Sequence, residues 1–317
     1  MINEHIIIFI LVIILLIFSI SMIKIIEFCV AKYNPKINPQ VDSRYELVIV
    51  AIFKNEEDYL EEWLQHYIEQ GVSHFYLYSN DPDMEKYTYL DKYKNYITMN
   101  EWIKDKINTP VSTIQMQAYD HCIKNYNNEY KYIMVLDIDE FMIYHDPNNI
   151  NNQKYTILQT LQNLTPNFKA VKVERYDYGS DGHIIKPPGK VVDNYFSHEK
   201  MCSSYKTIAN SEYIDTNTIF YDVHDFPYNN YGGRIYNKHM SYIYTNHPST
   251  CYMFPNIKSE VNLRINHYFT KSYDEYMKRC EMWKNAGVHN RGYRRKCKET
   301  FVEKNKRMSV LHDKKLK

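Results

Sequence analysis

Apolar strand-like runs alternate with a helical pattern in the first half of the chain, and this alternation narrows the possible folds more than any other feature. Residues 46–53 (ELVIVAIF) predict a buried strand, and residues 74–79 predict a second one. Between them, large apolar side chains from Tyr59 to Ile68 repeat at the spacing of one helix face that ends at Gly71. Strand, helix and strand in this order predict crossover connections and a mostly parallel sheet.

The same alternation continues further along the chain. We expect a short strand at 96–99, a helix at 112–125, and apolar strands at 132–136 and 170–174. The predicted fold class is therefore α/β, with a Rossmann-like, mostly parallel central sheet flanked by helices. The length of 317 residues allows either two average domains or one large α/β domain.

Charge and motif content exclude several classes of protein. Lys and Arg number 39 against 38 Asp and Glu, so no global field draws the chain to nucleic acid, and no nucleic-acid partner is expected. No GxGxxG follows the first strand and no GxxxxGK[ST] occurs, which argues against a dinucleotide-binding fold and a P-loop. The six cysteines lack zinc spacing, so a zinc site and a dense disulfide framework are excluded, while one or two disulfides stay possible.

An uncharged apolar run at 6–23 is long enough to span a bilayer. Glu4 and His5 precede it and Lys24 follows, which is atypical of a cleaved signal peptide and favours an uncleaved transmembrane helix. The predicted organisation is a short tail at 1–5, an anchor at 6–26, a stem at 27–44, a main domain at 45–280 and a basic C-terminal tail at 281–317.

The orientation of this anchor stays open. Lys24, Lys32, Lys36 and Arg44 follow the apolar run, and the positive-inside rule on its own would leave the main domain facing the cytosol.

Polar clusters follow three of the predicted strands: residues 54–56 (KNE), 80–81 (ND) and 137–140 (DIDE). Ligands of open α/β sheets bind beyond the carboxyl ends of the strands, where these clusters would meet. Asp137 and Asp139 could both reach a hard divalent cation, Mn²⁺ or Mg²⁺, which would bridge the oxygens of a nucleotide diphosphate. The alternative is a solvated loop, but delivery by an apolar strand favours the metal site.

Several motifs in register resemble glycosyltransferase family 92, formerly domain of unknown function 23, and the related family-2-like enzymes. They are AIFKNEEDYLEEWLQHYIEQGVSHFYLYSND from Ala51, then Trp102, LDIDEFM from Leu136, YKTIAN from Tyr205, Val223-His224, and INHYFTKSYDEYMKR from Ile265. The similarity covers residues 46–279 in the order that the family has.

The resemblance implies a GT-A fold, a nucleotide-sugar donor with a UDP-sugar favoured, and manganese on Asp137 and Asp139. It also implies a type II anchor in a Golgi- or ER-like membrane, and a glycan or glycoprotein acceptor. Members of known activity transfer galactose with inversion. One of two histidines, His224 or His267, would be a further metal ligand; we prefer His267, with His224 nearer the acceptor.

The remaining site residues follow from the same resemblance and from their positions. The expected base and ribose contacts are Lys54, Asn55, Glu56 and Asp81. Asp225, beside His224, is the predicted general base of an inverting transfer. Lys206 or Lys271 could hold the diphosphate as a point charge. The glycine-bearing turn at 178–183 is either a plain hairpin or part of the acceptor pocket.

Two other functions stay open. A nucleotidyl- or sugar-phosphate transferase would use the same metal carboxylates on the same fold. A non-catalytic, membrane-anchored glycan-binding protein would have no need of the Asp137 and Asp139 pair.

Overall fold

The structure is a computed structural model. It describes residues 15, 19, 22, 24, 43–103, 113–146, 154–164, 168–200, 204–220, 222–229, 234–237, 261–285, 296–309 and 311–312. Apart from isolated positions and residues 43–44, the predicted anchor and stem lie outside this part of the chain. Within it, no helix combines the length and apolar character needed to cross a membrane.

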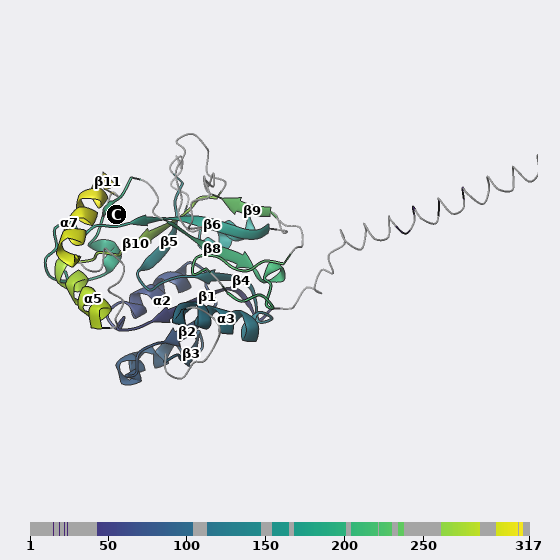
Figure 1. Ribbon diagram of the computed structural model, residues 1–317, viewed down its shortest axis with the longest axis horizontal. Coiled ribbons are helices and arrows are strands. Elements are labelled where there is room, and N and C mark those ends of the chain that lie inside the picture. The colour runs from purple at the N-terminus through teal and green to yellow at the C-terminus, as the bar shows by residue number, and fades with distance from the viewer. Residues whose placement is uncertain are drawn as a thin grey trace, which may run out of the picture.

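One mixed sheet forms the centre of the described chain (Figure 1). Its strands follow the order β3 (Ile97–Glu101), β2 (His74–Ser79), β1 (Tyr45–Phe53), β4 (Tyr130–Val135), β8 (Ser204–Asn210), β6 (Phe168–Asp177), β10 (Leu263–His267) and β5 (Glu140–Tyr144), and β9 (Arg234–Asn237) pairs with β6. The first four strands are parallel, as predicted. Strand β8 is antiparallel to both neighbours and β5 to β10, so the class is α/β but the sheet as a whole is mixed.

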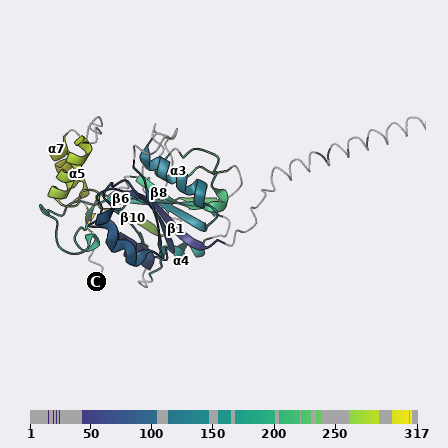
Figure 2. The same ribbon diagram turned by 90° about the horizontal axis from the view of Figure 1, so that it is seen from below.

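Both faces of β1 are buried, which explains why its sequence is continuously apolar. Successive side chains point to opposite faces: Leu47 and Ile49 enter one core with helices α2 (Leu60–Glu69) and α4 (Ile157–Gln162). Val48 and Val50 enter a second core with helix α3 (Ile114–Tyr126). Figure 2 shows α3 on one side of the sheet and α4 on the other. Short 3-10 helices complete the connections: η1 (Met84–Tyr93), η3 (Val191–Asp193) and η4 (Ser211–Tyr213).

Gly71 makes the turn from α2 into β2. Its φ is +92°, a conformation that strains residues with a side chain. A Cβ atom there would also lie 2.7 Å from Cβ of Leu158 in α4, so the backbone approaches this helix more closely than a side chain would permit. Glycine is therefore required at position 71, where the helix is predicted to end, both for the backbone conformation and for the packing against α4.

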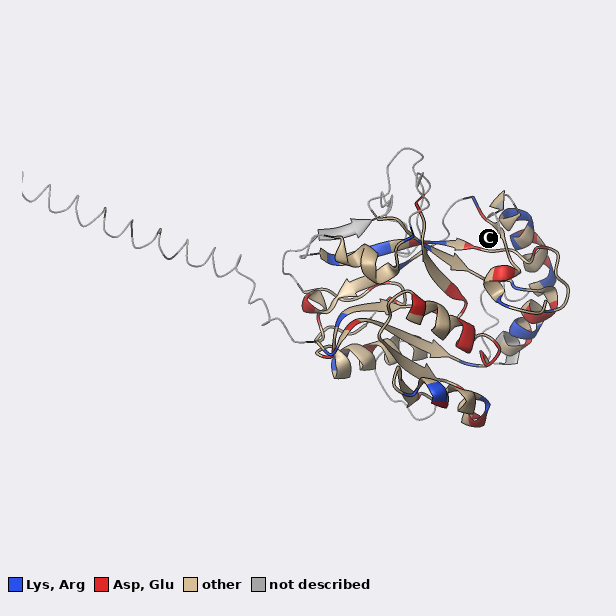
Figure 3. Ribbon diagram, turned by 180° about the vertical axis from the view of Figure 1, so that it is seen from behind, with Lys and Arg blue, Asp and Glu red and all other residues tan. Residues whose placement is uncertain are grey.

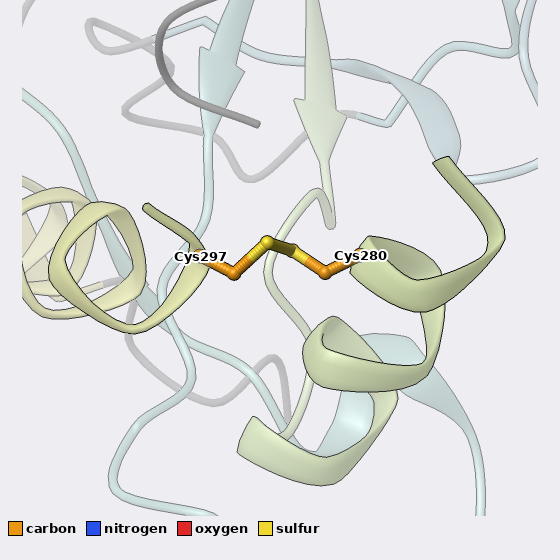
Figure 4. Close-up of a disulfide and its surroundings, with 2 residues drawn as sticks. All are labelled: Cys280 and Cys297. Carbon is orange, nitrogen blue, oxygen red and sulfur yellow. A yellow bond between two sulfur atoms is a disulfide. The ribbon is translucent and has the colours of Figure 1, made fainter. Parts of the chain in front are cut away.

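Two helices at one end of the molecule form a C-terminal hairpin, α5 (Tyr273–Asn285) and α7 (Cys297–Met308). A disulfide between Cys280 and Cys297 joins them (Figure 4). Beyond α7, β11 (Leu311–His312) pairs with β7 (Ser197–His198). The boundary predicted after residue 280 therefore falls inside α5, and the described part of 281–317 packs onto the domain because the disulfide and this ladder hold it there.

Candidate active site

The loops after β1 and β2 meet at the carboxyl edge of the sheet. The Asp81 carboxylate accepts from the backbone N of Asn55 at 3.2 Å and from Lys86 Nζ and Tyr87 Oη, both at 3.1 Å. Asn55 has a φ of +54°, which asparagine tolerates better than most residues. The structure thus brings Asn55 and Asp81 together as predicted, while Lys54 beside them is exposed.

Glu56 connects this edge to the C-terminal half of the chain. Lys271 Nζ lies 3.6 Å from Glu56 Oε2 and 3.4 Å from the centre of the Tyr59 ring, so its charge is met by a carboxylate and by an aromatic face. Burial lowers the pKa of the Lys271 ammonium below its ordinary 10.5, and burial raises the pKa of Glu56 above its ordinary 4.5. Lys271 also has a left-handed φ of +50°, a strain of the kind found at functional sites.

Asp137 lies in the turn that follows β4, with a side chain that is 35% exposed. Its Oδ1 accepts from Gln115 Nε2 at 2.8 Å and its Oδ2 from Lys206 Nζ at 3.1 Å. Burial acts to raise the pKa of Asp137, but the charges of Lys206 and Arg175 and the hydrogen bond from Lys206 together lower it below its ordinary 3.8. Lys206 is fully buried, so its contacts make it a support of Asp137 and not a free charge for a ligand.

A third carboxylate, Glu140, organises this turn from beneath. It is fully buried and accepts from Arg175 Nη1 at 2.9 Å and from the backbone N of Asp137 at 3.0 Å. Lys206 Nζ lies 3.4 Å from its Oε2. Sequence analysis noted Glu140 only as the residue after the motif and missed Arg175, because their contact depends on how the strands are ordered in the sheet.

Asp139, the residue before β5, meets His267, the last residue of β10. His267 Nε2 lies 3.5 Å from Asp139 Oδ1, and Arg279 Nη2 lies 3.1 Å from Asp139 Oδ2. Burial acts to raise the pKa of Asp139, but the charges of His267 and Arg279 hold it well below 3.8. Burial and Arg175 act to lower the pKa of His267, but Asp139 and Asp177 outweigh them and raise it above 6.5.

The donor set of Asp139 and His267 fits a divalent cation. On the other side of the ring, Nδ1 lies 2.6 Å from Asp177 Oδ1, so Nε2 is the nitrogen that can offer a lone pair beside Asp139. A carboxylate and an imidazole together are a donor set that divalent first-row transition metals accept. Among the described residues, no group of three or more His, Cys, Asp or Glu side chains is placed to hold a metal, so the remaining ligands would have to come from the substrate or water.

His224 and Asp225 lie elsewhere at this edge of the sheet. His224 Nδ1 is 3.1 Å from Asp222 Oδ1, and burial lowers the pKa of the ring below its ordinary 6.5. Asp225 forms an ion pair with Lys172 and accepts from Tyr228 Oη at 2.6 Å. In the described part of the chain, neither residue forms a hydrogen bond or ion pair with Asp137 or Asp139.

The predicted turn at 178–183 packs against α7. The backbone N of Ser180 donates to Asn305 Oδ1 at 2.6 Å, and a Cβ atom on Gly179 would lie 3.2 Å from that same oxygen. The Asp181 carboxylate accepts from the backbone N of Phe196 at 2.6 Å and of Ser197 at 3.1 Å. These contacts make the turn a contact surface for the C-terminal hairpin.

A cavity of about 370 Å³ lies between α7 and the ends of β6 and β10. Its lining includes Asp177, His267, Phe269 and Lys304. The Lys304 ammonium lies 4.1 Å from the centre of the Phe269 ring. Figure 3 shows further Lys and Arg segments at this helical end of the molecule.

Known proteins share this sequence pattern. The family model for glycosyltransferase family 92 matches residues 48–317. A curated glycosyltransferase family 92 protein of Ricinus communis is 24% identical over 192 residues, which is 58% of this chain and 31% of the plant protein. A second match to a protein of that family in the same plant is 21% identical over 196 residues, 61% of this chain and 33% of the relative. The chain thus spans about a third of the length of the curated relatives it matches.

Among solved structures, a mannosyltransferase from Pyrobaculum calidifontis in complex with GDP-Man and Mn²⁺ is 13% identical. The match has a TM-score of 0.28 and covers 45% of this chain and 39% of that one.

Proposed function

The chain belongs to glycosyltransferase family 92. From this membership we propose that it transfers a galactose-like hexose from a nucleotide-diphosphate sugar to a hydroxyl of a glycan or glycoprotein. The favoured donor is a UDP-sugar. The observation that carries the proposal is the contact of Asp139 with His267 at the carboxyl edge of the sheet, 3.5 Å apart and beside Asp137 in the chain. In this interpretation the mixed sheet is the central sheet of a GT-A fold.

We propose that Asp139 and His267 hold a Mn²⁺ ion, and that Asp137, two residues before Asp139 in the same turn, moves toward them to join the coordination when the ion binds. When bound, such an ion would stabilise the negative charge that develops on the leaving diphosphate. Lys206 and Glu140 hold the Asp137 turn and Arg279 holds Asp139, so the carboxylates lie at this edge of the sheet before an ion binds, and Asp137 would exchange its contact with Lys206 or Gln115 for the ion.

The loops after β1 and β2 are the proposed binding surface for the nucleotide. Asn55 and Asp81 are already joined by a hydrogen bond, and Lys54 and Glu56 flank Asn55. Lys271 reaches this loop from the C-terminal half, where its ammonium could neutralise a phosphate.

We propose that transfer inverts the sugar, with Asp225 taking the acceptor's proton. The proposal is supported by the position of Asp225 beside His224, whose buried ring has a lowered pKa. Asp225 would have to exchange its contact with Lys172 for the acceptor hydroxyl. A general base is worth about 10²–10⁴-fold in rate, so kcat of Asp225→Asn should fall by that factor. An unchanged kcat would leave Asp225 as an ion-pair partner only.

Product analysis tests the reaction itself. The full chain is incubated with UDP-sugars and Mn²⁺, and the released nucleotide is identified by chromatography. Release of nucleoside diphosphate supports glycosyl transfer, whereas release of pyrophosphate would establish the nucleotidyltransferase alternative. Glycan binding without turnover of any nucleotide sugar would establish the non-catalytic alternative.

We propose a single-pass membrane protein with the domain in the lumen of a secretory compartment. The Cys280–Cys297 disulfide supports this placement against the cytosolic one, because disulfides persist mainly in oxidising compartments. Protease added to intact microsomes should leave the domain uncut, and digestion without detergent would place it in the cytosol.

A further inference from the structure

Asp177 is the last residue of β6 and lies directly beside His267 of β10. The two residues are partners in the parallel register, so their side chains project from the same face of the sheet. Their contact, Asp177 Oδ1 to His267 Nδ1, is 2.6 Å long, and both residues are at most 5% exposed. A buried hydrogen bond to a carboxylate is strong and is not exchanged with water.

This contact determines which ring nitrogen is available. A carboxylate can only accept, so Nδ1 must carry a hydrogen, and in the neutral ring the lone pair is then on Nε2. Nε2 is the nitrogen that faces Asp139 at 3.5 Å. His267 therefore contacts Asp177 through Nδ1 and faces Asp139 through Nε2. The contact with Asp177 determines that the unprotonated nitrogen of the neutral ring is the one facing Asp139.

We propose that Asp177 is a positioning residue of the metal centre, which holds His267 in the orientation and tautomer that offer Nε2 beside Asp139. The inference rests on the proposed function for the existence of the metal site. Carboxylates in this position orient metal-bound histidines in other proteins and raise the basicity of the ring.

Asp177 is itself held in place by contacts beyond the one with His267. Its backbone N donates to Glu199 Oε1 at 2.9 Å, and Arg175 Nε lies 3.7 Å from its Oδ1. Lys304 Nζ of α7 lies 3.6 Å from its Oδ2. The carboxylate therefore cannot rotate away from the ring without breaking buried ion pairs, and the C-terminal hairpin contributes one of them.

Asp177→Asn in the full chain tests the positioning role of Asp177, because asparagine has nearly the same side-chain shape as aspartate. An amide can donate to Nδ1 through its NH₂ group and would then move the ring hydrogen to Nε2. Titration with Mn²⁺ alone, followed by the electron paramagnetic resonance signal of free Mn²⁺, should show affinity weakened about 10- to 100-fold, the range found for such outer partners. Arg307→Gln is the matched control, because this exposed cation lies 3.9 Å from the same carboxylate and, among the described residues, forms no hydrogen bond or ion pair with His267. The Mn²⁺ affinity of this variant should stay within about twofold of wild type.

A second measurement needs no variant. Nitrogen NMR of the histidine rings in the metal-free protein, at a pH where His267 is neutral, should show hydrogen on Nδ1 and none on Nε2. Hydrogen on Nε2 would overturn the inference, even if Asp177→Asn fails to fold.

The outcomes separate the inference from the proposed function. If the unmodified chain binds Mn²⁺ and His267→Ala weakens binding while Asp177→Asn does not, the positioning role is wrong and the metal site stands. If the unmodified chain does not bind Mn²⁺, both are wrong.

Discussion

Asp139 is 9% exposed and shares its two oxygens between His267 and Arg279. A buried carboxylate is tolerated only when its charge is matched, and removal of one partner from such a pair costs about 3–5 kcal/mol. Substitutions at this site therefore change stability as well as chemistry, and isosteric amide variants are better probes than alanine because they leave no cavity.

Asp139→Asn should reduce turnover by about 10²-fold or more, the scale on which loss of a charge-stabilising group acts, and should weaken apparent Mn²⁺ affinity. The measurement is nucleoside diphosphate release as a function of Mn²⁺ concentration. Asp91→Asn, an exposed aspartate on η1, is the control and should keep wild-type rates. Wild-type turnover of Asp139→Asn at saturating Mn²⁺ would remove Asp139 from the metal site.

Stability of the metal-free protein should depend on pH through His267. The ring's pKa is raised on folding, so its contribution is fully present below about pH 6.5, the unfolded value, and is lost as the pH rises through the folded value. Denaturation of wild type and His267→Gln across this range should show their difference in unfolding free energy shrinking with rising pH. A difference that grows with pH would contradict the raised pKa.

The sequence placed Asp137 and Asp139 at a strand end because an apolar run delivers them there, and Asn55 and Asp81 were predicted for the same reason. Asp177, Arg175 and Arg279 could not be found that way. Their roles depend on β6 pairing with β10 and on α5 bringing Arg279 to Asp139. Local periodicity in the sequence predicts neither of these contacts.

At the scale of elements, helix α2 holds the turn that carries the proposed metal carboxylates. Trp63 Nε1 lies 3.1 Å from the carbonyl oxygens of both Asp137 and Glu140. Tyr67 Oη donates to the Glu140 carbonyl at 2.9 Å and accepts from the backbone N of Met142 at 2.7 Å. The face predicted to carry the large apolar side chains of this helix thus also donates hydrogen bonds to the turn.

Trp63→Phe should destabilise the fold by about 0.5–1.5 kcal/mol and lower Mn²⁺ affinity, because the Asp137 and Glu140 carbonyls each lose one donor while keeping another. Urea denaturation and Mn²⁺ titration measure the two effects. Tyr76→Phe is the control, since its hydroxyl donates to Glu129 at the opposite end of β4 from this turn, and it should change stability but not affinity. Equal metal affinity in Trp63→Phe and wild type would show that α2 does not position the site.

The strands and helices predicted between residues 46 and 136 are present with small errors at their ends, whereas η1 and β5 were not predicted. The strand expected at 132–136, for example, is β4 at 130–135. The chain beyond residue 136 was harder to predict because β8 and β5 run antiparallel to their neighbours, and strand direction is set by connections that periodicity does not encode.

For the whole molecule, the disulfide decides how firmly the C-terminal hairpin stays on the domain. Cys280 and Cys297 are separated by 17 residues, and closing a loop of that length is worth about 3 kcal/mol. Replacing both with serine should lower the free energy of unfolding by about that amount. A reducing agent should have the same effect on wild type and none on the variant; equal stability of both proteins under oxidising conditions would contradict it.

Arg279 and Asp139, which form an ion pair across the site, are 140 residues apart in the sequence. During synthesis, Asp139 therefore leaves the ribosome many residues before its partner exists. At typical elongation rates of about 5–20 residues per second, Arg279 is synthesised on the order of ten seconds after Asp139. A nascent chain of this protein must therefore stay soluble with an incomplete site, and any message cut short before α5 yields a product that cannot assemble it.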